Sequence, residues 1–463
     1  MGLEDAAALA RVVSAAVRWA LALVALGVAW LWLQAPQLAL LPGDEPLYLL
    51  DAQRLLDGGA LYHDVFLAHP PARVWQAALV LATGAPIAWA KVWSPLATLA
   101  SAALLFRLIA KDGKPGLGFL AAFLFLLSNV VLVHGALFVG VEQASAIATL
   151  ATVLALSGHW LLAGLTLSLA SQWALHVALL ALPLAVWAWR AGAMRRLMLG
   201  LALGLLPLLL ELLWFGEPMI DQVFAYHLRK VTHMAAQKVP DRVWPFLTWQ
   251  APLLVLAAIG AWRGSQLARA LGLSGFAVLA LVLLWPRLQA YYFLLPMPWL
   301  AAAAALAFDV ANLQRQPFHL RIVALLIVLG LVRPSVESAL ARRTSAIAAK
   351  IEMIQLAAQV QTLAGGKPLW GDGALVPLLS LRTGLPVALG DTDVNAQRFQ
   401  SGVTPPVAHL AAVLTQKPLI VLVPRHGIDL VPEIHDQILR DCEVVGQFNA
   451  PSANFAGLLL RPR

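Results

Sequence analysis

The chain has 463 residues, of which 60% are hydrophobic and only 12% are charged. An apolar share so far above that of soluble domains excludes an ordinary soluble protein and predicts an integral membrane protein. The formal net charge of +8 gives little reason to expect a nucleic-acid partner, because basic side chains flank membrane spans and set their orientation. Cys442 is the single cysteine, which excludes an intrachain disulfide.

Apolar runs bounded by charge, glycine or proline predict the membrane spans. A bilayer is crossed by about 20 mostly apolar residues, and residues 19–42 contain no charged side chain. Glu4 and Asp5 precede this run where a signal peptide would be basic, so we interpret it as a retained helix. The predicted spans are 18–40, 86–109, 117–133, 142–157, 161–189, 197–215, 248–262, 271–285, 291–308 and 320–333.

The run 161–189 is too long for one crossing, and Gln172, Trp173 and His176 interrupt it near its middle. We therefore divide it into two short passes, which makes eleven spans. With a cytoplasmic N-terminus, the basic loops then follow the positive-inside tendency, except for the outer loop 216–247. The odd number of spans makes the C-terminal part extracytoplasmic. We expect a multi-pass protein of a bacterial inner (plasma) membrane.

The residues after the last span predict a small α/β domain. The segment KPLIVLVPRHG (417–427) is a short apolar run between proline and glycine, which is typical of a buried strand. LPVALGD and EVVGQF predict further strands, and PPVAHLAAVLTQ and PEIHDQILRDC predict helices. The predicted fold is thus mostly α: a polytopic helical domain, 1–334, with outer loops 42–73 and 216–247, followed by an extracytoplasmic α/β domain, 335–463.

The first outer loop contains the strongest candidate for catalysis. Asp44 precedes EPLYLLDAQRLLDGG, an amphipathic helix that would lie on the membrane surface and end at Gly58 and Gly59. One interpretation is that Asp44 only caps this helix. The other is that a partly desolvated carboxylate at the outer membrane boundary serves as a general base for a hydroxyl. His69 is presented at a turn by the two prolines that follow it.

These residues resemble a known family. The segment DEPLYLLDAQRLLDGGALYHDVFLAHPP (44–71) is similar to the first outer loop of GT-C glycosyltransferases of the protein O-mannosyltransferase and aminoarabinose transferase branch, the type of glycosyltransferase family 39. WLLAGLTLSLASQWALHVALLALPL (160–184) resembles the double pass of that family. RLQAYYFLLPMPWLAAAAAL (287–306) resembles its late span. A small extracytoplasmic α/β domain follows in many relatives.

The resemblance implies an inverting transfer of a sugar from a polyprenyl-phosphate carrier, either independent of metal or weakly assisted by a divalent cation. It implies no metal-binding residues in this chain. Asp44 matches the catalytic aspartate of the family and Glu45 its neighbour. His69 stands where aminoarabinose transferases have the lysine of their KPP, which contacts the carrier phosphate. Gln172 and Trp173 replace the usual TK of the double pass.

The chemistry of the donor leads to the same expectation. Nucleotide sugars are absent outside the cytoplasm, so the donor there is carried on a lipid, and its leaving group is a phosphate that cations must stabilise. Arg229 and Lys230, in the loop that departs from the positive-inside tendency, and Arg287 are the candidate cations. Glu142, at the outer mouth of a span, is a further candidate for substrate binding. For each of these the alternative is a solvated or headgroup-binding surface.

The sequence leaves other functions open. Asp391 and Asp393 form a D-x-D pattern that binds a metal in other glycosyltransferases, but two aspartates after a strand are more often turn formers. A non-enzymatic transporter or lipid flippase is the main alternative, although internal repeats are not apparent. A scaffold with a degenerate site is a third. We expect membrane lipid and a protein, lipid or glycan acceptor as partners.

Overall fold

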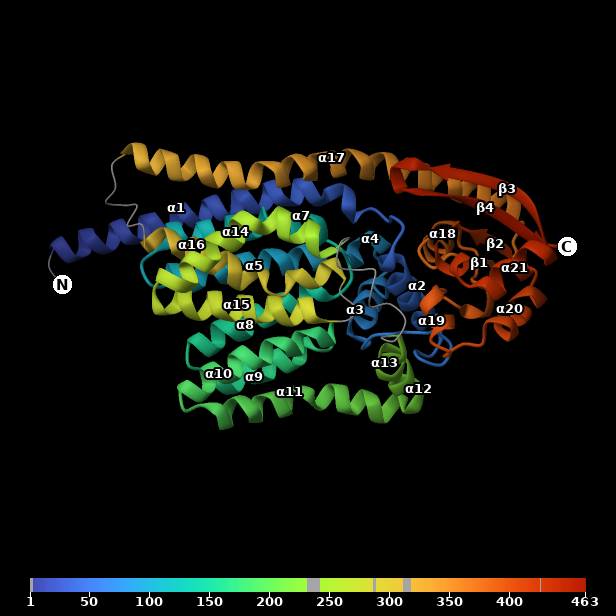
Figure 1. The fold of residues 1–463 in the computed structure, drawn as a ribbon, viewed down its shortest axis with the longest axis horizontal. Helices are drawn as coiled ribbons and strands as arrows, with labels where there is room; N and C mark the ends of the chain where they lie inside the picture. Colours follow the sequence, from blue (N-terminus) through green and yellow to red (C-terminus); the bar gives the residue numbers. More distant parts are fainter. Residues whose placement is uncertain (1–2, 231–241, 286–288, 311–317, 425) are drawn as a thin grey trace. The chain divides into compact units, whose positions relative to one another are not determined.

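The computed structural model describes residues 3–230, 242–285, 289–310, 318–424 and 426–463 (Figure 1). The chain divides into two compact units. The first comprises Met1–Ala35, Trp93–Pro207 and Ala235–Ala341, and the second comprises Pro36–Val92, Leu208–Met234 and Arg342–Arg463. The predicted boundary at residue 334 lies inside one continuous helix, α17 (Phe318–Ala364). The two sequential domains therefore stay a prediction, and the two units are described here one at a time.

The first unit is a bundle of helices. Its elements are α1 (Leu3–Gln34), α5 (Trp93–Ala110), α6 (Pro115–Leu126), α7 (Asn129–His134), α8 (Val141–Leu156), α9 (Trp160–Ala170), η2 (Leu175–Leu180), α10 (Ala181–Arg190), α14 (Trp244–Arg263), α15 (Gln266–Leu284), η6 (Ala290–Leu294) and α16 (Met297–Val310), with parts of α11 (Met194–Phe215) and α17. Among the described residues, five helical segments are long and apolar enough to cross a membrane: residues 16–38, 87–110, 194–215, 244–263 and 266–284. The predicted interruption near Gln172 is present, because α9 ends at Ala170 and η2 begins at Leu175.

Small residues let these helices approach closely. A Cβ atom on Gly260 of α14 would lie 2.2 Å from the carbonyl oxygen of Ala303 on α16. A Cβ atom on Gly200 of α11 would lie 2.1 Å from the carbonyl oxygen of Leu161 on α9. Between apolar helices in a lipid solvent, packing of this kind is a main source of association. The contacts explain why the runs around Ala301–Ala305 are so rich in alanine.

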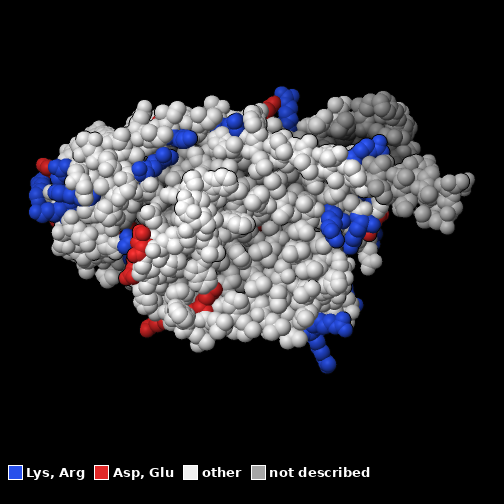
Figure 2. All heavy atoms as spheres, turned by 180° about the vertical axis from the view of Figure 1, so that it is seen from behind, with Lys and Arg blue, Asp and Glu red and all other residues white. Residues whose placement is uncertain are grey.

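The outer surface of the helices is suited to lipid. Figure 2 shows a broad surface of mostly uncharged residues with Lys and Arg in a few small groups. On α11, Leu209, Leu210, Leu213 and Trp214 are all more than half exposed. Such a concentration of exposed apolar side chains is unfavourable in water and expected in a bilayer.

The second unit combines Pro36–Val92 and Leu208–Met234 with the C-terminal residues Arg342–Arg463. Its helices are α2 (Asp44–Leu56), α3 (Ala72–Leu81), α4 (Ile87–Ala90), α12 (Glu217–Ile220), η3 (Asp221–Ala225), α13 (Tyr226–Lys230), α18 (Val376–Thr383), η8 (Ala388–Gly390), α19 (Ala396–Gln400), α20 (Pro406–Thr415), η9 (Gly427–Leu430), α21 (Pro432–Asp441) and η10 (Pro451–Ala453). Its strands are β1 (Leu369–Gly371), β2 (Leu419–Leu422), β3 (Cys442–Ala450) and β4 (Phe455–Pro462), in the order β1-β2-β4-β3. β1 and β2 are parallel, and the other pairs are antiparallel.

The strands β1 and β2 are buried on both faces. Because side chains alternate along a strand, Leu419 and Val421 of β2 join a core with α17 and α18, while Ile420 and Leu422 join a second core with α20 and α21. Figure 1 shows α17 beside β3 and β4, and α20 and α21 on the other side. Burial on both faces explains why residues 419–423, LIVLV, are all apolar.

Most of the predicted elements of this part are confirmed, and one is wrong. PPVAHLAAVLTQ and PEIHDQILRDC form α20 and α21, and EVVGQF lies in β3. LPVALGD is not a strand: only Val387 makes a β-bridge, to Leu369, and η8 follows it. Leu389 and Gly390 have φ values of 56° and 72°, which lie in the left-handed region and end any extended backbone.

Candidate active site

Asp44 is the first residue of α2 and is exposed. The N-cap position belongs to Gly43, whose φ of 140° suits glycine, and no side chain caps α2. The helix is held at this end because the Gly43 N–H donates to the carbonyl oxygen of Ala374, at 3.3 Å. The capping role that the sequence allowed for Asp44 is thus taken by another residue, while its charge still interacts favourably with the helix dipole.

Tyr48 follows Asp44 by one helical turn and lies at the centre of a group of charges. Its ring is buried, and the guanidinium carbon of Arg73 lies 4.4 Å from the ring centroid. Burial raises the pKa of Tyr48, Arg73 lowers it, and the carboxylates of Asp44, Asp393 and Asp51 raise it further. The Tyr48 hydroxyl is therefore neutral, and both a positively charged side chain and negatively charged side chains act on it.

His69 reaches the same tyrosine from the loop that precedes α3. Its ring centroid lies 6.0 Å from that of Tyr48, in an edge-on arrangement, and 5.5 Å from the ring of His227 on α13. The hydroxyl of Tyr62 donates to the His69 carbonyl at 2.8 Å, and His227 Nε2 lies 2.7 Å from the Ala68 carbonyl oxygen. The fold thus places His69 against Tyr48, one helical turn after Asp44, although His69 and Asp44 are 25 positions apart in the chain.

The loop that carries His69 is fixed by η3. Gln222 accepts a hydrogen bond from the Leu67 N–H at 2.8 Å and donates one to the Tyr62 carbonyl at 2.7 Å. Phe66 packs edge-on against Tyr226, with 5.3 Å between the ring centroids. Amide side chains that satisfy two backbone groups at once hold a loop without regular structure. The segment 62–69 is therefore positioned by residues that lie about 160 positions away.

Glu45 is paired with a buried lysine. Lys91 is fully buried, and its Nζ donates to Glu45 Oε2 at 3.1 Å and to the carbonyl oxygens of Gln37 and Ala39 at 2.6 and 2.8 Å. All three donors of the ammonium group are thus satisfied. The predicted span 86–109 agrees with the apolar helical segment 87–110, within which Lys91 lies between α4 and α5. A buried charge cannot lie in contact with lipid, so this part of the chain belongs to the folded interior.

The C-terminal residues contribute an acid and imidazole pair beside Asp44. Asp372 is fully buried, and its Oδ1 accepts hydrogen bonds from the N–H groups of Ala374 and Leu375. Its Oδ2 lies 2.5 Å from Nδ1 of His426, whose side chain is about half exposed. The hydrogen bond to Asp372 raises the pKa of His426, burial opposes this, and the charges of Asp372 and Asp44 add to the increase. His426 is therefore a cation over a wider pH range than an isolated histidine.

The two aspartates of the D-x-D pattern have partners inside the protein. Asp391 is paired with Arg398 and with His409 Nε2, the latter at 2.7 Å. Burial opposes ionisation, but Arg398 and His409 hold the pKa of Asp391 below its usual value. Asp393 accepts a hydrogen bond from the Asn395 amide at 2.6 Å. Within the described ranges, no three His, Cys, Asp or Glu side chains are grouped as they would be to hold a metal ion.

The remaining predicted site residues are placed less fully. Arg229 is exposed on α13, and it is His227 of the same helix that lies beside His69. The Lys230 side chain and the whole of Arg287 lie outside the described residues. Glu142 is buried in the first turn of α8, in the first unit, whereas Asp44 and His69 belong to the second.

Sequence reasoning missed several residues of the cluster. Tyr48 and Arg73 could have been found, because Tyr48 follows Asp44 by four positions on one helix face and Arg73 is a basic residue two positions after the prolines. Lys91 was visible as a charge inside a predicted span. Asp372, His426 and His227 carried no local signal, because only the fold brings them to the first outer loop.

Comparison with known proteins identifies the fold. No protein-family model and no curated protein matches the chain. Among solved structures, ArnT from Cupriavidus metallidurans in the apo state superposes with a TM-score of 0.65, 14% identity, and coverage of 96% of this chain and 98% of ArnT. The same ArnT bound to undecaprenyl phosphate gives a TM-score of 0.62 at 14% identity, covering 95% and 98%.

A second enzyme is similar over less of its own length. The arabinofuranosyltransferase AftD from Mycobacteria has a TM-score of 0.51 and 16% identity, with 95% of this chain and 39% of AftD covered. Identities this low establish a shared fold and no more. The resemblance seen in the sequence is confirmed at that level: this chain is an integral membrane protein with the GT-C fold of ArnT and AftD.

Proposed function

We propose that this protein is a glycosyltransferase that moves a sugar from a polyprenyl-phosphate carrier to a hydroxyl group of an extracytoplasmic acceptor. The observation that carries the proposal is the cluster around Tyr48, which His69 and Arg73 contact and which follows Asp44 by one helical turn, together with the charge interaction between Asp44 and His426. The fold supports it, because one of the similar structures is ArnT with undecaprenyl phosphate bound.

In the proposed reaction, Asp44 accepts the proton of the acceptor hydroxyl as that oxygen attacks the anomeric carbon. The bond from the anomeric carbon to the phosphate oxygen breaks, the configuration inverts, and polyprenyl phosphate leaves as an anion. Arg73 and His69 stabilise the charge that develops on the phosphate. Exposure of Asp44 suits this role, since the acceptor must reach it, and no step requires a metal ion.

The other predicted residues have supporting roles in this proposal. Glu45 positions Asp44, because its ion pair with Lys91 ties the first turn of α2 to Gln37 and Ala39. Arg229, Lys230, Arg287 and Glu142 stay candidates for substrate binding. We further propose a cytoplasmic N-terminus and an extracytoplasmic second unit in a bacterial inner membrane, which places the cluster where lipid-carried sugars are available.

The decisive measurement compares Asp44→Asn with Asp436→Asn in purified full-length protein. Undecaprenyl-phosphate-linked sugars serve as donors, and release of undecaprenyl phosphate is followed by mass spectrometry. Asp436 is an exposed aspartate on α21 and provides the matched control. We expect release by the wild type and by Asp436→Asn. Full activity of a well-folded Asp44→Asn variant contradicts the assignment of the base.

The alternative, a transporter or lipid flippase, is tested in the same preparation. Protein in vesicles that moves a lipid-linked sugar or a solute across the bilayer, without releasing undecaprenyl phosphate, would favour that function. Mass spectrometry of envelope glycans and glycoproteins from cells with and without the gene then identifies the acceptor. A new glycan difference supports transfer, and unchanged glycans with altered solute uptake support transport.

A further inference from the structure

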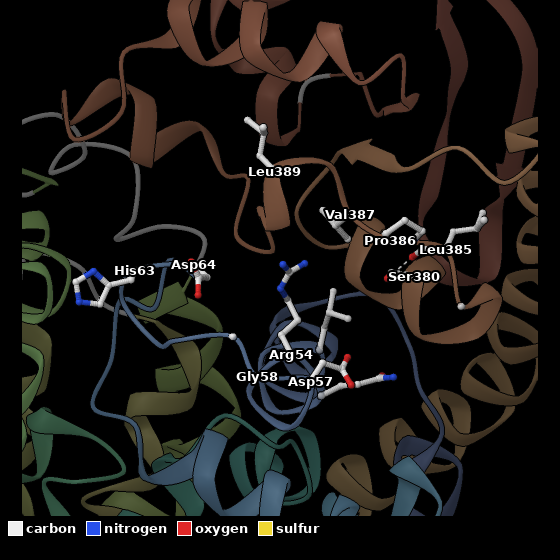
Figure 3. Close-up of a pocket in the computed structure, with 14 residues that line it drawn as sticks. Arg54, Asp57, Gly58, His63, Asp64, Ser380, Leu385, Pro386, Val387 and Leu389 are labelled. Carbon is white, nitrogen blue, oxygen red and sulfur yellow. Dashed lines mark hydrogen bonds between the residues drawn. The ribbon is translucent and has the colours of Figure 1, made fainter.

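A cleft of about 630 Å³ lies in the second unit, apart from the Tyr48 cluster. It is lined by the last turn of α2 and the turn after it, by residues 63–64, and by residues 384–389 with Ser380 (Figure 3). Its volume falls within the range of about 300–1,000 Å³ of small-molecule sites. The rim is fixed by a 2.7 Å hydrogen bond from the Ser380 hydroxyl to the Leu385 carbonyl, drawn as a dashed line in Figure 3.

Arg54 is the central polar group of the cleft. Figure 3 shows its side chain rising from α2 toward the 385–389 segment. The guanidinium packs closely against Gly390, where a Cβ atom would lie 2.4 Å from Nη2. Its Nε is buried and has no hydrogen-bond acceptor among the residues that the structure describes. A buried donor of this kind costs free energy unless a ligand or water satisfies it.

The charges of the lining define the kind of ligand. One arginine and two aspartates, Asp57 and Asp64, leave one net negative charge when His63 is neutral. Such a lining repels phosphate and carboxylate groups, and its polarity does not suit an isoprenoid chain. It offers both donors and acceptors, which is what a ligand rich in hydroxyl groups requires. Leu389, 42% exposed with a left-handed backbone, adds an apolar contact for the C–H face of a sugar ring.

A second cavity of about 130 Å³ shares His63, Asp64 and Leu389 with the cleft and continues to Gln222 and Asp391. Along α2, the ten residues from Asp44 to Arg54 correspond to about 15 Å at 1.5 Å per residue. A ligand that occupies the cleft and reaches Asp44 must therefore be longer than one sugar.

We propose that this cleft binds the acceptor, and that the acceptor is a glycan chain whose sugars are uncharged or carry amines. The inference rests on the proposed transferase function and adds the class of acceptor to it. In this arrangement, sugars behind the reacting residue occupy the cleft while the terminal hydroxyl lies at Asp44. Arg54 and His63 are binding residues and take no part in the chemical step.

The test measures binding separately from transfer. Purified full-length protein in lipid nanodiscs is titrated with mannotriose, chitotriose, arabinotriose, the chitosan trimer and trigalacturonate, and saturation-transfer NMR and calorimetry report binding. The variants are Arg54→Gln and the exposed-site variant His63→Ala, with Arg440→Gln on α21 as the matched control. Thermal unfolding confirms that each variant is folded.

We expect at least one neutral or amine-bearing trisaccharide to bind the wild type and Arg440→Gln equally. Binding should weaken at least tenfold in Arg54→Gln and His63→Ala. Preference for trigalacturonate, unchanged binding in both cleft variants, or no measurable binding of any trisaccharide overturns the inference. Loss of transfer in Asp44→Asn together with unchanged trisaccharide binding in the cleft variants would reject acceptor binding in the cleft. The proposed transferase function would stand. Weakened trisaccharide binding in the cleft variants, with no release of undecaprenyl phosphate by the wild type, would reject the transferase and keep the cleft as a glycan-binding site.

Discussion

The Lys91 ion pair allows a quantitative test of what positions the catalytic aspartate. Replacement of Lys91 by methionine keeps the length of the side chain but removes its charge. Glu45, 7% exposed, is then left without its cationic partner, and the carbonyl oxygens of Gln37 and Ala39 lose a donor. Breaking a buried pair by removing one partner costs about 3–5 kcal/mol. We expect Lys91→Met to lower the free energy of unfolding by that amount.

The assay is denaturant unfolding of the full-length protein in detergent, with Lys350→Met as control, because Lys350 is exposed on α17. A double-mutant cycle with Glu45→Gln isolates the pair. The double variant should be more stable than the sum of the single effects predicts, since it contains neither an isolated buried carboxylate nor an isolated buried ammonium. Strictly additive effects, or a Lys91→Met loss below about 1 kcal/mol, would refute the reasoning.

Three further predictions follow from the same unit. Asp44→Asn should lower the transfer rate by about 10²–10⁴-fold, the usual contribution of a general base, with little change in donor affinity; a change confined to affinity would contradict this. Because the folded-state pKa of His426 is raised, its pair with Asp372 stabilises the fold fully below about pH 6.5 and loses this effect as pH rises through the raised value. The difference in unfolding free energy between wild type and His426→Gln, measured from acid to alkaline pH, should therefore shrink as pH rises. A difference that does not change with pH would contradict the proposed contribution of the pair. Gly390→Ala should cost more stability than Gly402→Ala by about 1 kcal/mol or more, since both have positive φ but only Gly390 faces Arg54; equal losses in unfolding experiments would argue against the contact.

Local patterns in the sequence were sufficient for much of the fold. Apolar runs gave the membrane helices, because transfer of a helix into lipid depends on its own composition. The strand at 419–422 and the helices α20 and α21 followed from periodicity and from the prolines and glycines beside them. The outer-loop residues were sufficient to identify the GT-C resemblance, which the solved structures confirm as a fold. Each of these features is decided within a few residues of itself.

Tertiary structure decided which side chains meet. Lys91 pairs with Glu45, 46 positions away, and His426 pairs with Asp372, 54 positions away. The sequence could indicate that Asp44 and His69 share a loop, yet only packing brought His69 to Tyr48 and His227 beside His69. The physical reason is that burial removes water from charged groups. The partner that then compensates for the lost hydration is selected by proximity in the folded chain, and spacing along the sequence does not encode it.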